Sequence, residues 1–408
     1  MPPDPAASRE GPRAKALAVG DRARELVGMT SASRERLLAL DVFRGATVAG
    51  MLLVNNPGSW AAIYPPLAHA TWHGWTPTDL IFPFFLFIVG VTTHLSVEAR
   101  RARGDDEGAI LRQLLTRGAL IILFGWLLAA FPFWPLTRIT ELRIPGVLPR
   151  IGLAYMGAAL LTRRGSLRRQ LLTLVALLYG YWFAMTLLPV PGEGGFGVNL
   201  LDDPTRSLAA WLDRRLLEGH LWKASRTWDP EGVLSTVPAI GTVMLGVFAG
   251  RWLGSGRSLA ERLNGLFAAG AIAMMLGLMW NWSFPINKAL WTSSYVLFAA
   301  GVASVSLATI MWITEVQRLT RWTGFFVTYG LNPMVAFLGS GLMAKLIYSL
   351  WKIEVEGQPV AVQGVIYRGL FASWMAPRTA SLAFAVCVVL VWYAVLRLLQ
   401  RRGIVFKV

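Results

Sequence analysis

The chain has 408 residues, of which 55% are hydrophobic and only 15% are charged. Soluble domains carry about 25% charged residues, so this composition excludes an ordinary soluble protein, and repeated apolar stretches of about 18–25 residues indicate bilayer spans. The formal net charge of +16 would suit a nucleic-acid-binding protein, but basic residues in short loops between spans set membrane orientation instead, so we expect no nucleic-acid partner. Because Cys387 is the sole cysteine, a disulfide framework within the chain is excluded.

The apolar stretches predict an all-α polytopic membrane protein with about ten, or at most eleven, transmembrane helices. Residues 1–33 are rich in Pro, Ala, Arg and Ser without apolar periodicity, which predicts a disordered cytoplasmic tail, and residues 34–408 form one transmembrane domain. The predicted spans are residues 37–54, 80–98, 118–134, 147–161, 171–188, 233–253, 266–280, 295–314, 325–347 and 380–399. The span 147–161 is short and contains Arg150.

The basic residues sort the loops between these spans into two kinds. Ten spans place both termini on one side, and Lys and Arg recur in the loops of that side. The first loop on the opposite side, residues 55–79, contains neither. By the positive-inside rule, both termini are therefore cytoplasmic.

The first span contains a pair of opposite charges, Asp41 and Arg44. Their spacing of three places them on one helix face, where they can pair. Charges within a membrane are costly and face the protein interior. The pair either locks helices together near the cytoplasmic end or belongs to a buried site.

The loop that follows, residues 55–79, is the densest polar and aromatic stretch of the chain. It contains Asn55, His69, His73 and Asp79. Histidine suits proton transfer near neutral pH, and a His–Asp relay would align the imidazole. Asp79 also fits as the N-cap of the next span. We expect no metal site, because the prolines and glycine around the two histidines oppose the helix that their spacing would need.

Three later clusters and one arginine repeat the pattern of polar groups beside span ends. Asp229 and Glu231 open a span, which helix-dipole interactions alone would favour. Lys288, near Asn287 and Trp291, can snorkel or hold an anionic group. Asn332 precedes a proline inside a span, where it serves a freed backbone group or faces a cavity, and a buried Arg150 would pair or bind phosphate or carboxylate.

Several blocks of the sequence resemble one known family. The blocks are LDVFRG, VNNPG, HATWHGWTPTDLIFPFFLFIVG, DPEGVLSTVPAI, PINKALWTSSYVL and RRGIVFKV. In this order, over residues 35–408, they resemble the heparan-α-glucosaminide N-acetyltransferase family of transmembrane acyltransferases. The resemblance is to a bacterial-type member without the luminal N-terminal domain of the lysosomal enzyme, which implies an integral protein of a bacterial inner (plasma) membrane.

The resemblance implies transfer of an acetyl group from cytoplasmic acetyl-CoA to the amino group of a glucosamine-type sugar on the opposite face. His69 matches the family's active-site histidine and Asn55 the asparagine that accompanies it, although the spacing between them is longer here than in the lysosomal member. We add Asp79 as the partner of the histidine. The other candidate residues are Arg44, Arg150, Asn287, Lys288, Trp291 and Asn332 for acetyl-CoA, and His73, Asp229 and Glu231 for the acceptor.

Two other classes of function fit the same features. A sugar transporter or permease would also have ten spans with intramembrane polar residues, and an O-acyltransferase would modify a hydroxyl of a cell-envelope glycan. The sequence leaves open whether an acetyl-histidine forms. Acceptor choice depends on the long loops 189–232 and 348–379, whose amphipathic stretches predict interfacial helices. The resemblance also implies a homodimer.

Overall fold

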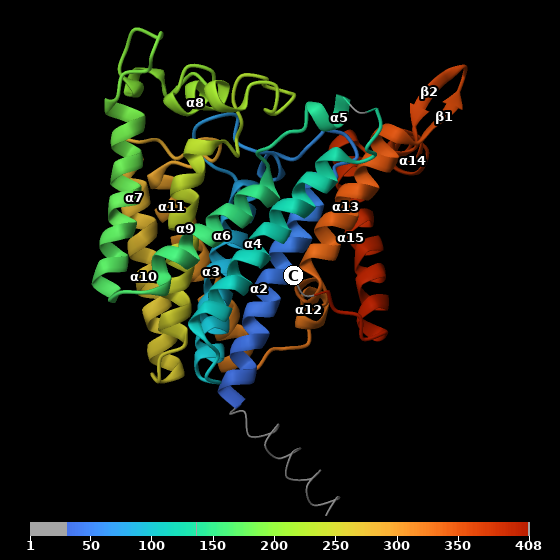
Figure 1. Cartoon of the computed structure of the whole chain (residues 1–408). Helices are drawn as coiled ribbons and strands as arrows, with labels where there is room; N and C mark the ends of the chain where they lie inside the picture. The colour runs from blue at the N-terminus through green and yellow to red at the C-terminus, as the bar shows by residue number, and fades with distance from the viewer. Residues whose placement is uncertain (1–30, 136, 407–408) are drawn as a thin grey trace, which may run out of the picture.

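The computed structural model describes residues 31–135 and 137–406. The prediction of a disordered tail concerns residues 1–33, of which 1–30 lie outside the described residues, and helix α2 begins at Ser31. The described chain is a bundle of long helices roughly parallel to one another, with shorter elements gathered at one end (Figure 1). Helix α2 begins and α15 ends at the opposite end of the bundle, which we call the proximal end. The end with the shorter elements is the distal end.

The prediction of an all-α polytopic membrane protein is confirmed. Nine described helices are long and apolar enough to cross a membrane. The long helices are α2 (Ser31–Asn55), α3 (Ile81–Arg101), α4 (Glu107–Ala130), α6 (Val147–Arg163), α7 (Leu167–Leu187), α9 (Val233–Leu253), α10 (Leu259–Trp280), α11 (Ser293–Met311), α13 (Pro333–Lys345) and α15 (Pro377–Arg401). Helix α6, the predicted short span, has 17 residues, so it is about 26 Å long.

Two helices begin earlier in the sequence than predicted, so they extend beyond their apolar stretches toward the proximal end. Helix α4 begins at Glu107 because Asp106 caps it, accepting from the Ala109 backbone N–H at 3.0 Å. Helix α10 begins at Leu259 after a capping box formed by Ser258 and Glu261. Capping residues satisfy the free N–H groups of a first turn, so both helices continue past the apolar segment into the charged region.

The predicted span 325–347 is broken in the middle. Helix α12 (Thr323–Leu331) ends before Asn332, and α13 begins at Pro333 and continues into a π-helical turn, η5 (Leu346–Leu350). Proline cannot donate the backbone hydrogen bond that a continuous helix needs. The break lies inside the bundle, next to α2. A Cβ atom on Gly45 of α2 would lie 1.7 Å from the Phe326 carbonyl oxygen, so only glycine permits this close contact between α2 and α12.

The long loops contain short elements at the distal end. As predicted, the first carries an amphipathic helix, α8 (Leu208–Leu217), and the second carries α14 (Val362–Tyr367) with the π-helical turn η6 (Arg368–Ala372). The sequence did not predict the hairpin of β1 (Lys352–Val355) and β2 (Gln358–Ala361), which projects from the bundle (Figure 1). The remaining short elements are η1 (Pro65–Leu67), η2 (Pro77–Leu80), α5 (Thr137–Thr140), η3 (Gly197–Leu200) and the π-helical η4 (Trp312–Val316).

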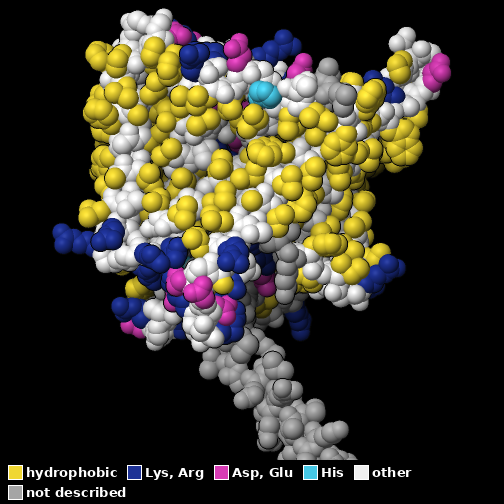
Figure 2. Space-filling model, viewed as in Figure 1, with side chains coloured by type: hydrophobic (Ala, Val, Ile, Leu, Met, Phe, Trp, Pro, Cys, Tyr) yellow, Lys and Arg dark blue, Asp and Glu magenta, His cyan; other side chains and the backbone are white. Residues whose placement is uncertain are grey.

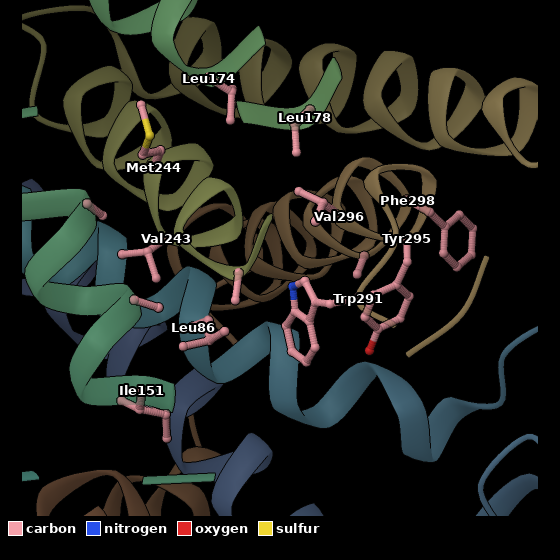
Figure 3. Packing of buried hydrophobic residues seen from close by; sticks show 14 of the residues in the cluster. Leu86, Ile151, Leu174, Leu178, Val243, Met244, Trp291, Tyr295, Val296 and Phe298 are labelled. Atoms are coloured by element: carbon pink, nitrogen blue, oxygen red, sulfur yellow. The ribbon is translucent and has the colours of Figure 1, made fainter. Parts of the chain in front are cut away.

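The molecule has a buried hydrophobic core and a second, exposed apolar surface around its middle. Trp291 and Tyr295 lie edge to face with ring centroids 5.3 Å apart in the central core, which α3, α6, α7, α9 and α11 build (Figure 3). Outside, a broad hydrophobic belt separates two ends that carry charged side chains (Figure 2). Exposed residues of α7, α10 and α15, including Leu172, Ile272 and Val391, contribute to this apolar exterior. Such a belt suits the hydrocarbon core of a bilayer.

Candidate active site and the pocket that adjoins it

The loop between α2 and α3 brings His69 against Asp79. The Nδ1 atom of His69 lies 2.6 Å from Oδ1 of Asp79. The other carboxylate oxygen, Oδ2, accepts from the backbone N–H groups of Ala70 and Thr76, both at 3.0 Å. Asp79 is buried, whereas the His69 side chain is 48% exposed. A fixed carboxylate on Nδ1 orients the ring and leaves Nε2 as its basic nitrogen.

Asp79 serves both roles that the sequence suggested for it. It lies in η2, where it completes a capping box with Thr76, and it is also the partner of His69. Its backbone carbonyl accepts from the hydroxyl of Tyr295. Because the carboxylate is held from several sides, it cannot turn away from the imidazole.

Lys288 joins this pair from the loop between α10 and α11. Its Nζ atom lies 3.0 Å from Nδ1 and 3.4 Å from Nε2 of His69, and 3.5 Å from Oδ1 of Asp79. Burial lowers the pKa of Lys288 below that of an ordinary lysine, and the charge of Asp79 opposes this shift. The site is therefore an imidazole, a carboxylate and an amine within hydrogen-bonding reach of one another.

These groups open onto a pocket of about 200 Å³ that runs into the bundle. Its polar end is lined by His69, Lys288, Glu231 and Asn55, the last residue of α2. Its inner walls are apolar, lined by Val48, Met51, Phe82, Phe85, Val147, Leu148, Ile151, Pro333, Met334 and Phe337. A pocket with polar, reactive side chains at one end and apolar walls along the rest suits a long, uncharged substrate arm that lies along those walls.

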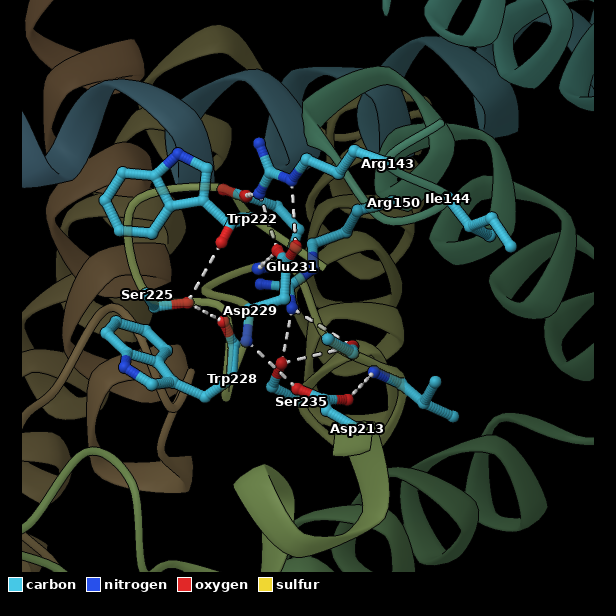
Figure 4. A network of polar contacts seen from close by, with 12 residues as sticks. Arg143, Ile144, Arg150, Asp213, Trp222, Ser225, Trp228, Asp229, Glu231 and Ser235 are labelled. Atoms are coloured by element: carbon cyan, nitrogen blue, oxygen red, sulfur yellow. Dashed lines mark hydrogen bonds and ion pairs between the residues drawn. The ribbon is translucent and has the colours of Figure 1, made fainter. Parts of the chain in front are cut away.

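A network of charges from the segments that precede α6 and α9 lies beside the pocket (Figure 4). Arg143 donates to both oxygens of Asp229, from Nε at 2.8 Å and Nη2 at 2.5 Å, and it also pairs with Glu231. The Asp229 side chain has no exposure, whereas Glu231 keeps 10% and lines the pocket. Of the two predicted acceptor-binding carboxylates, Asp229 therefore holds Arg143, and Glu231 faces the cavity.

Asp213 of α8 holds the N-terminus of α9. Its carboxylate accepts from the backbone N–H groups of Val233 at 2.9 Å and Asp229 at 3.2 Å. Burial raises the pKa of Asp213 to about 6, against these hydrogen bonds, which lower it. Asp213 was not predicted from the sequence, because it lies in the long loop 189–232, which was interpreted only as interfacial. Arg143, in the short loop before α6, was not predicted either.

Arg150 and Trp291 lie behind the pocket. The side chain of Arg150 is buried, with its guanidinium 5.1 Å from the centre of the Trp291 ring. It donates to the Gly232 carbonyl and to the Ser235 hydroxyl. Trp291 donates from Nε1 to the Thr242 hydroxyl at 3.1 Å. In the described structure, both residues join α6, α9 and α11 and neither lines the pocket of His69.

His73 and Asn287 lie at the distal rim. The Nε2 atom of His73 lies 2.8 Å from the exposed carboxylate of Asp202, and its Nδ1 lies 3.3 Å from Nδ2 of Asn287. Asn287 is fully buried and also accepts from the Leu290 backbone N–H. Asn287 therefore positions the loop that carries Lys288, and His73 faces the distal side.

A second, wider pocket of about 830 Å³ opens at the proximal end. Arg44 of α2 lines it, and so do Arg112 and Arg117 on the extended first turns of α4. Arg44 is paired with Asp41, as expected, and also donates to the Gly330 carbonyl at 2.7 Å. Sequence patterning counted Arg112 and Arg117 only as loop charges, because the apolar stretch of α4 begins after them.

The two pockets share a wall at the break between α12 and α13. Pro333 and Met334 line both of them. Asn332, one residue earlier, lines neither among the described residues. Both groups of its amide bind the chain after α15: Nδ2 donates to the Ile404 carbonyl at 3.1 Å, and Oδ1 accepts from the Phe406 N–H at 2.9 Å.

Comparison with known proteins gives one consistent result. Residues 36–286 match the family described as "Heparan-alpha-glucosaminide N-acetyltransferase, catalytic". The chain is 30% identical over 372 residues to the human protein named heparan-alpha-glucosaminide N-acetyltransferase, and 31% identical over 373 residues to the mouse protein of that name. Both matches cover 79% of this chain, which spans about half the length of these relatives, 55% and 56% respectively.

Proposed function

The chain belongs to the heparan-α-glucosaminide N-acetyltransferase family, and from this premise we propose what it transfers and in which direction. The donor is acetyl-CoA, bound at the proximal, cytoplasmic end. The acceptor is the amino group of a glucosamine-type sugar at the distal end. The protein is integral to the membrane, and we propose the bacterial inner membrane as its location.

One observation supports this proposal most strongly: an arginine-lined pocket and a histidine-containing pocket meet at Pro333 and Met334. Acetyl-CoA has its negative phosphates at one end and its thioester at the end of a long, uncharged pantetheine arm. Arginines suit phosphate binding, and the narrow inner walls suit the arm. The phosphates would stay at the proximal end while the thioester reaches His69.

The side chains around the distal end of the pocket suit acyl transfer. His69 Nε2 takes a proton from the acceptor amine, whose nitrogen attacks the thioester carbon. The side-chain amide of Asn55 donates to the oxyanion that forms, and Asp79 stabilises the imidazolium. The C–N bond forms as the C–S bond breaks, and the proton passes from His69 to the departing thiolate.

Glu231 and Lys288 give the acceptor end its charge. Glu231 faces the cavity close to the reactive histidine, so it can bind the ammonium form of an amino sugar. Lys288 lies beside the imidazole of His69 and the carboxylate of Asp79, where its ammonium adds a positive charge to the acceptor end of the pocket. His73, on the distal rim with Asp202, would contact the remainder of the sugar.

The direct test is acetyl transfer by the purified protein from labelled acetyl-CoA to a panel of amino sugars and glycan fragments. We expect transfer to glucosamine-type amines and its loss in the variants His69→Ala and Asn55→Ala, with both proteins still folded. Transfer only to hydroxyl groups would instead identify an O-acyltransferase. Solute uptake into vesicles without any transfer would identify a transporter.

A rapid-quench experiment without acceptor distinguishes transfer through an acetyl-histidine intermediate from direct transfer to the acceptor. If His69 carries the acetyl group, an acetylated protein accumulates that the His69→Ala variant does not form. If transfer is direct, no labelled protein appears.

The proposed homodimer is tested separately, by the mass of the purified protein in detergent.

A further inference from the structure

The chain after α15 turns back into the bundle. Gly403 has a φ of +69°, a conformation that glycine adopts without strain. The Gly403 N–H donates to the Gln400 carbonyl at 3.0 Å and the Ile404 N–H to the Leu399 carbonyl at 2.9 Å. This pair of bonds is a Schellman motif, which ends a helix and redirects the chain. In Figure 1 the chain leads from the lower end of α15 back toward α12.

Asn332 fixes the returning segment, residues 403–406, in place. Its side chain is fully buried at the break between α12 and α13, and it bonds the backbone on both sides of Val405. Two hydrogen bonds from one rigid amide define both the position and the direction of the segment. Because Asn332 immediately precedes Pro333 and Met334, the same residue joins the segment to the wall between the two pockets.

The segment places an aromatic ring, that of Phe406, at the arginine-lined pocket. Val405 and Phe406 line this pocket opposite side chains from α2 and α4. Phe406 is 56% exposed, although its backbone is held by Asn332. A large, exposed apolar ring thus lies in the same pocket as the three arginines, an arrangement that suits a ligand with a flat face next to its phosphates.

We propose that Phe406 is a donor-binding residue that stacks on the nucleobase of the acetyl donor, and that Asn332 positions it. This inference rests on the proposed function, because it assigns a binding residue to the nucleotide end of the proposed donor, acetyl-CoA. Aromatic side chains stack on any base, because every base has a π-face, and such contacts contribute substantially to affinity. Arg44, Arg112 and Arg117 would hold the adjoining phosphates, and the arm would pass Met334.

The test compares two donors that differ only in the nucleotide: acetyl-CoA and S-acetyl-4′-phosphopantetheine, which has the arm but no base. For Phe406→Ala we expect the KM for acetyl-CoA to rise on the order of tenfold, with kcat and the KM for acetyl-phosphopantetheine within twofold of the unchanged protein. Phe406→Trp should restore acetyl-CoA binding. Trp322→Ala is the control, because Trp322 is an exposed aromatic at the same end that does not line this pocket.

For Asn332→Ala we expect the same selective rise in the KM for acetyl-CoA, and no further rise when Phe406→Ala is added, since the two act through one contact. The proposal is overturned if Phe406→Ala leaves the KM for acetyl-CoA unchanged. It is also overturned if the variant weakens both donors equally, which would indicate a structural role. Absence of transfer by the unaltered protein from either donor would contradict the proposed function itself.

Discussion

The imidazole of His69 and the carboxylate of Asp79 meet at 2.6 Å between Nδ1 and Oδ1, although they lie on either side of a loop that contains two tryptophans and a glycine. The opposite carboxylate oxygen is fixed by two backbone N–H groups. The backbone of this loop therefore fixes the orientation of the histidine, whose side chain lines the pocket.

We expect Asp79→Asn to reduce kcat by at least about a hundredfold, because the amide cannot stabilise the imidazolium and favours the wrong tautomer. The KM for acetyl-CoA should stay unchanged, since the proposed site for the donor's phosphates lies at the other end. Steady-state kinetics check this. Asp202→Asn, which removes the carboxylate beside His73 on the rim, is the matched control and should change kcat only slightly. An equal loss in both variants would contradict a special role for Asp79.

The lowered pKa of Lys288 predicts an alkaline limit of activity. As pH rises, Lys288 loses its proton earlier than an ordinary lysine, because burial disfavours the ammonium. If the ammonium is needed, activity falls at pH values below the normal lysine range. In Lys288→Arg, whose guanidinium stays protonated, the decline should move to higher pH. A pH–rate profile with the same alkaline limb in both proteins would exclude Lys288 as its origin.

Asp213 predicts a pH dependence of stability. Its pKa is raised to about 6 in the folded protein and is near 4 when unfolded, so the folded state holds the proton more tightly. This contribution is complete below about pH 4 and is lost as pH rises through 6, at most about 3 kcal/mol for two pKa units. Melting temperatures between pH 4 and 7 should fall more steeply for the unaltered protein than for Asp213→Asn. Glu218→Gln, on an exposed residue just after α8, should leave the slope unchanged.

The arginines on the first turns of α4 are predicted to bind the donor phosphates. The double variant Arg112→Gln, Arg117→Gln should raise the KM for acetyl-CoA at least tenfold and weaken its dependence on salt, with the acceptor KM unchanged. The control is Arg168→Gln, because Arg168 lies at the proximal end but does not line the pocket. A loss of acceptor binding instead of donor binding would place the donor elsewhere.

The membrane architecture could be predicted because it depends on local properties. The lengths of the apolar stretches predicted the long helices. The short stretch around Arg150 corresponds to the short helix α6, and the Asn–Pro pair at 332 marks the break before α13. Helix starts were harder: Glu107 begins α4 well before the apolar stretch because Asp106 caps it. The hairpin at residues 352–361 was missed because its short, exposed strands carry no hydrophobic face.

The candidate site could be predicted only in part, because its contacts join distant segments. The sequence indicated His69, Asp79 and Lys288, but Lys288 lies 219 positions from His69 and only the fold brings their nitrogens to 3.0 Å. Arg143 escaped notice because a loop arginine has no local signature, and its partners, Asp229 and Glu231, fit a helix N-terminus equally well. Asn332 was expected to face a cavity or bind backbone, and it binds the backbone of a segment 72 and 74 positions away.

In the proposed reaction, an acetyl group crosses the membrane while its carrier does not. The most direct measurement places the protein in sealed vesicles of known orientation, with labelled acetyl-CoA on the proximal side only and glucosamine on the distal side only. We predict N-acetylglucosamine on the distal side, no coenzyme A there, and no product with His69→Ala. Product that appears only when donor and acceptor share one side, or equal product from His69→Ala, would contradict acetyl transfer across the membrane by His69.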